Sequence, residues 1–77
     1  MKFKLFDSVV LTRDLPEHGL HDGDLGAVVH IHEPDALEIE FFNASGETQT
    51  VIAVHASDLR PAEQNDLESM RRIRRSA

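Results

Sequence analysis

The length and composition of the chain limit it to one small domain with a thin core. It has 77 residues and no cysteine, which excludes disulfides, a thiolate metal site and a cysteine nucleophile. A chain of this size buries roughly 60% of the surface that its unfolded form exposes, so a deep substrate pocket would remove part of the core. Size therefore favours binding through an outer surface over catalysis.

Charge is distributed unevenly along the chain, whose net charge is −6. Residues 1–61 carry four Lys/Arg against eleven Asp/Glu, a balance of −7, whereas residues 62–77 carry four Arg against three acids. An acidic surface repels phosphate backbones, because nucleic-acid affinity comes largely from Lys and Arg. The charge predicts a protein partner with a basic surface and argues against nucleic acid. No stretch has the hydrophobicity of a signal peptide or of a membrane span, so we expect a cytoplasmic protein without a membrane partner.

The first half of the chain predicts two strands joined by a long loop. Residues 7–12 form the first strand, with Val9 and Leu11 facing inward. The loop, residues 13–23, holds one proline and two glycines and is too long for a hairpin and too broken for a helix. Residues 25–32 form the second strand. Strict alternation places four of its side chains on the inner face: Leu25, Ala27, Val29 and Ile31.

The third strand has the clearest pattern in the chain. It follows a Pro-Asp turn at residues 33–36 and alternates apolar residues with the acids Glu38 and Glu40. Its inward residues are Leu37, Ile39 and Phe41. Such alternation is typical of a strand that packs on the core with one face and meets water with the other. We therefore expect an acidic outer face on this strand.

The remaining elements complete an all-β pattern. A turn with Gly46 leads to the fourth strand, residues 47–54. Thr50, Ile52 and Val54 form its expected core face, with Val51 and Ala53 as the alternative inward residues. A helical turn at 56–58 precedes a short closing strand at 59–61. This order predicts a small five-stranded SH3-like β-barrel over residues 1–61, with an open antiparallel sheet as the structural alternative.

Residues 62–77 predict a C-terminal tail, either a short helix or disordered. Asn65 is positioned to cap a helix, with Glu68 three residues on. Leu67, Met70 and Ile73 fall on one side, and four arginines follow late in the segment. A helix of this length is marginal alone, so we expect it to fray unless it docks on the barrel or on a partner.

Five segments carry a resemblance to known proteins: Phe6-Asp7, Val9-Val10-Leu11, residues 15–20, residues 23–29 and residues 57–61. Through them the chain resembles a family of short, uncharacterised bacterial proteins classed as a domain of unknown function. Residues 12–16, with Gly23 and residues 26–29, are also similar to the SH3-like C-terminal domain of the nitrile hydratase β subunit. These resemblances imply an SH3-like barrel, a bacterial cytosolic setting and, by analogy, a small partner of a toxin-like or enzyme-like protein. They imply no catalytic residue.

The long loop and the third strand supply the predicted partner-binding residues, since long loops on rigid scaffolds tend to carry function. These residues are Pro16, Glu17, His18, Leu20, Glu38 and Glu40. Pro16 and Leu20 are the expected apolar anchor within an acidic rim. The chain has no Tyr or Trp, so it lacks the aromatic groove that binds Pro-rich peptides.

The leading hypothesis is a non-enzymatic protein–protein interaction module without a cofactor, antitoxin-like or immunity-like, that binds a basic partner. One alternative is a nucleic-acid-associated domain of the KOW type, which shares the spacing of Gly23, Gly26 and Val28. Another is a metal-binding protein using His30 and His32, which project from the same face of a strand. Zinc normally needs a third and a fourth ligand, so we expect no tight metal site.

Overall fold

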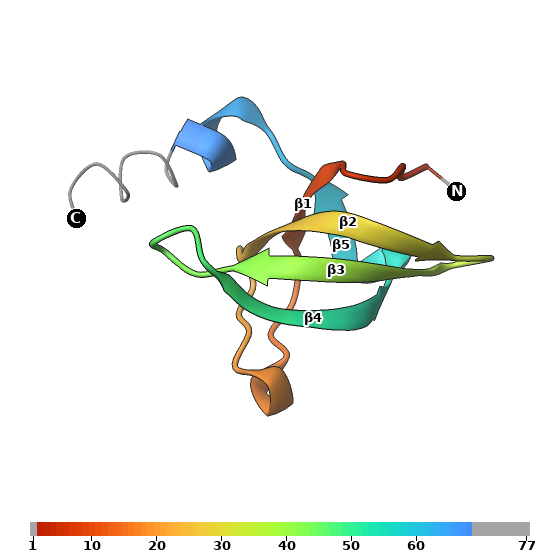
Figure 1. The fold of residues 1–77 in the computed structure, drawn as a ribbon, viewed down its shortest axis with the longest axis horizontal. Helices are drawn as coiled ribbons and strands as arrows, with labels where there is room; N and C mark the ends of the chain where they lie inside the picture. The colour runs from red at the N-terminus through yellow and green to blue at the C-terminus, as the bar shows by residue number, and fades with distance from the viewer. Residues whose placement is uncertain (1, 69–77) are drawn as a thin grey trace.

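The computed structural model describes residues 2–68 and contains a single antiparallel sheet of five strands (Figure 1). The strands are β1 (Ser8–Leu11), β2 (Leu25–His32), β3 (Ala36–Phe42), β4 (Thr48–His55) and β5 (Leu59–Pro61). Two 3-10 turns, η1 (Pro16–His18) and η2 (Ala56–Asp58), precede β2 and β5. The spatial order is β4-β3-β2-β1-β5. The predicted all-β, barrel-like fold is confirmed.

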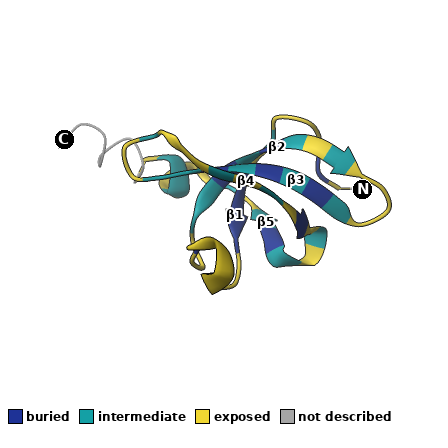
Figure 2. Ribbon diagram, turned by 60° about the horizontal axis from the view of Figure 1, so that its bottom comes forward, coloured by how far each residue is buried: buried dark blue, intermediate teal, exposed yellow. Residues whose placement is uncertain are grey.

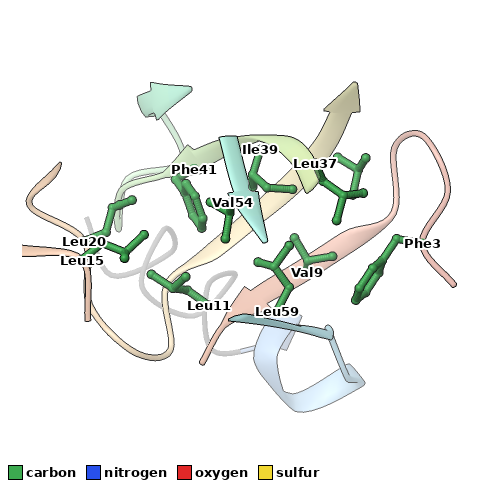
Figure 3. Packing of buried hydrophobic residues seen from close by; sticks show 11 residues of the cluster. Phe3, Val9, Leu11, Leu15, Leu20, Leu37, Ile39, Phe41, Val54 and Leu59 are labelled. Atoms are coloured by element: carbon green, nitrogen blue, oxygen red, sulfur yellow. The ribbon is translucent and has the colours of Figure 1, made fainter. Parts of the chain in front are cut away.

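The sheet curls around one core, which Figure 3 shows between the strands. Leu37, Ile39 and Phe41 are fully buried on the inner face of β3, as the alternation predicted. Val9 and Leu11 of β1 pack in the same cluster. From β4 come Ile52 and Val54, on the predicted core face, and from β5 comes Leu59. Figure 2 shows how buried and more exposed positions alternate along β3.

A β-bulge in β2 makes the prediction for Val29 wrong. Val28 lies opposite Ile39, and the next paired residue, His30, lies opposite Glu38, so Val29 has no partner on β3. An extra residue reverses which side chains face inward from that point on. Val28 is therefore fully buried and Val29 only half-buried. After the bulge Ile31 faces the core as predicted, whereas Leu25 and Ala27, before it, lie on the outer face.

Gly26 allows β2 and β3 to approach each other closely on the core side. A Cβ atom at this position would lie 2.6 Å from Cγ2 of Ile39 and 2.8 Å from the carbonyl oxygen of Glu40. Both distances are shorter than van der Waals contact, so a side chain would force the strands apart. The glycine spacing that suggested a KOW-type domain thus has a packing role at this position.

Segments outside the sheet close both ends of the core (Figure 3). Phe3 covers one end and is 3% exposed. Leu15 and Leu20 cover the other end, where they face each other across an isolated antiparallel bridge within the long loop. The predicted loop is therefore an ordered excursion with one 3-10 turn. Its two leucines stabilise the barrel.

The segment after β5 is tied to the barrel by an ion pair. Residues 64–68 are helical and begin two residues earlier than predicted, so the N-terminal cap falls on Glu63 and not on Asn65. The carboxylate of Asp66 accepts the backbone N–H of Glu63 at 2.7 Å and binds the guanidinium of Arg60 at 2.9 and 3.1 Å. The predictions for Met70, Ile73 and the arginines after them lie outside the described residues.

Candidate partner-binding surfaces

The loop residues predicted to bind a partner divide into exposed and buried ones. Pro16, Glu17 and His18 form η1 and are exposed. Leu20 is 1% exposed and belongs to the core cluster. Its predicted role as an apolar anchor at an interface is therefore wrong, because a partner cannot reach its side chain. Pro16, the other residue of the predicted apolar anchor, is exposed and accessible to a partner.

The two acids of β3 lie on the outer face of the sheet, as predicted, and both are half-buried. A carboxylate oxygen of Glu38 lies 3.0 Å from Nε2 of His32, within hydrogen-bond distance. Glu40 accepts the hydroxyl of Thr48 on β4. The loop, by contrast, packs against the core side through Leu15 and Leu20. The structure thus places the acids and the loop on different sides of the sheet, and they do not form one continuous surface.

Three histidines share the outer face at one end of the sheet. The rings of His30 and His32 have centroids 4.6 Å apart, and His55 lies on β4, level with His32 but separated from it by Ala36. Two strand spacings amount to about 10 Å, too far for a common ion. His55 lies instead 3.9 Å from a carboxylate oxygen of Asp35. Within residues 2–68 no three His, Cys, Asp or Glu side chains are grouped to hold a metal.

A cleft of about 520 Å³ opens between the long loop and the turn that joins β3 to β4. Among the polar residues of its lining are His21, Asp24, Gln49 and Asp66. Three of these already have partners within the protein. Asp24 accepts the backbone N–H of His21, Gln49 donates to the carbonyl of Gly19, and Asp66 binds Arg60. These groups therefore hold the loop and the C-terminal segment in place.

The electrostatics of this region depend on Asp66. The hydrogen bond from Arg60 is the largest of the effects that lower the pKa of this carboxyl to about 2, and the backbone N–H of Glu63 adds to it. The same pair raises the pKa of Arg60. Stabilisation of a carboxylate by a neighbouring cation and by donated hydrogen bonds is the expected cause of such shifts. Among the described residues, this pair is the shortest ionic contact between the sheet and the segment that follows it.

The outer edge of β4 offers backbone groups that sequence reasoning missed. The N–H of Ala56 bonds to the carbonyl of Asp35 at the start of the β3–β4 ladder. In an antiparallel ladder the bonded pairs alternate, so Val54 and Ile52 bond to β3 while the intervening residues point their N–H and C=O groups away from it. These intervening residues are Val51, Ala53 and His55. The uncharged composition of β4 was the one feature of the sequence that could have indicated this site. That β4 lies at an edge of the sheet follows only from the spatial order of the strands.

A groove of about 190 Å³ runs beside this edge. One wall is β4, from Ile52 to His55. The other wall is the long loop, which contributes Arg13, Leu15, Glu17 and His18. Two of the predicted partner-binding residues, Glu17 and His18, thus line a concave surface.

These features define a small all-β domain with two candidate binding surfaces, an acidic outer face and an open strand edge. The model of a family described as "Domain of unknown function (DUF4926)" matches residues 5–61. The chain belongs to this family, and the matched segment includes all five strands. No curated protein and no solved structure matches the chain. No helix within residues 2–68 is long and apolar enough to cross a membrane.

Proposed function

We propose that the chain is a non-enzymatic protein-interaction module, antitoxin-like or immunity-like in role, whose acidic surface binds a basic partner protein. The supporting observation is that no charged residue among those described is buried. Residues 1–61 contain eleven Asp/Glu and four Lys/Arg, so the accessible surface of this part of the chain carries an excess of negative charge. Two of the four cations, Arg13 and Arg60, are already paired with Asp58 and Asp66. A field of this sign steers a basic protein toward the domain and repels phosphate backbones.

The proposal includes an SH3-like arrangement of the barrel. It is supported by the order of elements: strand, long loop, three strands joined by tight turns, a 3-10 turn and a short strand. The bacterial cytoplasm, as the setting of the interaction, and the likeness to the nitrile hydratase β subunit rest on sequence resemblance. Fold alone does not assign function, so the charge carries the proposal.

Charge reversal on the outer face tests the proposal. A double variant, Glu38→Lys with Glu40→Lys, should slow association with a partner that co-purifies from the native host, and the wild-type on-rate should fall as salt rises. Since both side chains point outward, the variant should stay folded. The matched control is Glu33→Lys with Glu47→Lys, which makes the same change of net charge in the two turns.

The outcomes separate the protein-binding proposal from nucleic-acid binding. We expect the β3 variant to weaken the complex and the turn control to leave most of the affinity. Unchanged binding by the β3 variant would contradict the proposal. A random DNA duplex serves as the second ligand. If wild type binds the duplex and loss of the acids strengthens that binding, the KOW-type reading is supported instead.

A further inference from the structure

The backbone of β4 lacks the features that normally protect an edge strand. Natural edges are short or carry charges, prolines or covering segments, because unpaired N–H and C=O groups otherwise pair with another chain. β4 has eight residues, from Thr48 to His55, with no Asp, Glu, Lys, Arg or Pro. It is rich in Thr, Val and Ile, which favour extended backbone. Val51 on the same strand is 47% exposed.

The groove beside β4 is bounded on its far side by the long loop. The side chain of Gln49, near the start of β4, donates to the carbonyl of Gly19 in this loop at 3.0 Å. In Figure 1 the loop extends past β4 on the side away from β3. A second copy of the whole domain would have to pass this loop to pair edge to edge, whereas a single extended segment can lie between the loop and the strand.

The charges around the groove favour a segment with basic side chains. Glu17 in the loop wall forms no ion pair within the described residues. Among the described residues, Arg13 is the one Lys or Arg that lines the groove, and its guanidinium lies 3.6 Å from the carboxylate of Asp58. The groove therefore has an unneutralised carboxylate, that of Glu17, on its loop side.

We propose that β4 binds an extended basic segment of a partner protein as an added sixth strand, through the N–H and C=O groups of Val51 and Ala53 and the N–H of His55, whose C=O belongs to the first turn of η2. In strand addition, main-chain hydrogen bonds supply affinity and the alternating side chains supply specificity. The inference rests on the proposed function, since it names how the basic partner is bound. The inference differs from the proposed function in the atoms that bind the partner, which are backbone atoms of β4 and not the carboxylates of β3.

The test uses a probe peptide of about seven residues in which valine and lysine alternate, titrated into the full chain and followed by backbone amide NMR. The expected result is that the amide signals of Val51, Ala53 and His55 shift together and saturate. Ala53→Pro removes one free N–H at a position where an edge strand tolerates proline. It should weaken binding about tenfold or more, because a ladder bond is lost and the ring blocks approach. Ala53→Ser keeps the N–H and serves as the matched control.

A second probe keeps the test decisive if Ala53→Pro fails to fold. The same peptide with every backbone amide N-methylated retains its side chains and charge but cannot donate to a ladder. Wild-type protein should lose binding to it. Equal binding of both peptides, or no shift of the three amides at millimolar peptide, would overturn the proposal. If Ala53→Pro binds the co-purified partner normally while the Glu38→Lys, Glu40→Lys variant does not, strand addition is wrong and the acidic-face proposal stands.

Discussion

The two edges of the sheet, β4 and β5, are built in opposite ways. At the outer edge of β5 the N–H of Leu59 bonds to the carbonyl of Ala56, Pro61 has no N–H, and the carbonyl of Pro61 accepts from Arg60. No N–H of β5 therefore remains free at this edge. β4, by contrast, presents the outward N–H groups of three alternate residues, Val51, Ala53 and His55.

The difference shows which edge is available for pairing. The segment after β5 is held by Arg60 and Asp66, and β5 has only three residues, so another chain finds few groups to pair with there. β4 is longer and uncharged, and its neighbouring loop leaves a groove instead of a cover. One edge is thus satisfied within the domain, and the other depends on solvent or a partner.

The largest effect is expected from the core on which both edges depend. Phe41→Ala should lower the free energy of unfolding by about 3–5 kcal/mol, through lost burial and the cavity left behind. In a domain of this size that change is comparable with the whole stability. Chemical denaturation provides the measurement. Phe42→Ala, next in the chain but half-buried on the other face, is the control and should cost far less. Similar losses in both variants would contradict the assignment of the inner face.

A smaller effect is expected at the protected edge, from the Arg60–Asp66 pair. The pKa of Asp66 is lowered from 3.8 to about 2 in the folded protein, so ionised Asp66 stabilises the fold above about pH 4. That contribution is lost as the pH falls through 2. Thermal unfolding of wild type and Asp66→Asn should therefore differ at pH 5–7, and the difference should shrink between pH 4 and 2. If the difference in stability between wild type and Asp66→Asn stays constant over this range, the ionised carboxylate of Asp66 is not the source of the stabilisation.

The smallest effect is expected from zinc at the histidines near the end of β4. His30 and His32 are close together, but His55 lies beyond Ala36. Calorimetry at neutral pH should therefore show at most weak heats that a modest competitor abolishes. Submicromolar binding that disappears in the His30→Ala, His32→Ala double variant would show that the outer face rearranges to complete a metal site.

Local patterns in the sequence predicted much of the fold. The bounds of β2, η2 and β5 agree with the prediction, and so does the inward face of β3, because period-two alternation and turn residues are local signals. The bulge at Val29 was not predicted, since it depends on how β2 matches β3. Leu20 was assigned to the surface because its loop lies between strands, yet packing against the core cluster, to which strands far away in the chain contribute, buries it.

The candidate site was less predictable than the fold. The exposure of Glu38 and Glu40 follows from alternation within one strand. Which strand lies at an edge is a property of the spatial order β4-β3-β2-β1-β5, to which residues far apart in the chain contribute. The pairing of Arg60 with Asp66 depends on the helical turn after β5, for which the sequence indicated a different cap.

Amide hydrogen exchange along β4 in the free protein tests most directly whether its edge is open. Ile52 and Val54 bond to β3, so their amides should exchange slowly, whereas those of Val51 and Ala53 should exchange at least about tenfold faster. Leu59, whose N–H is bonded within the domain, should be protected at the other edge. Slow exchange at Val51 and Ala53 in the free protein would show that the edge of β4 is already covered, and the contrast between the two edges would be wrong.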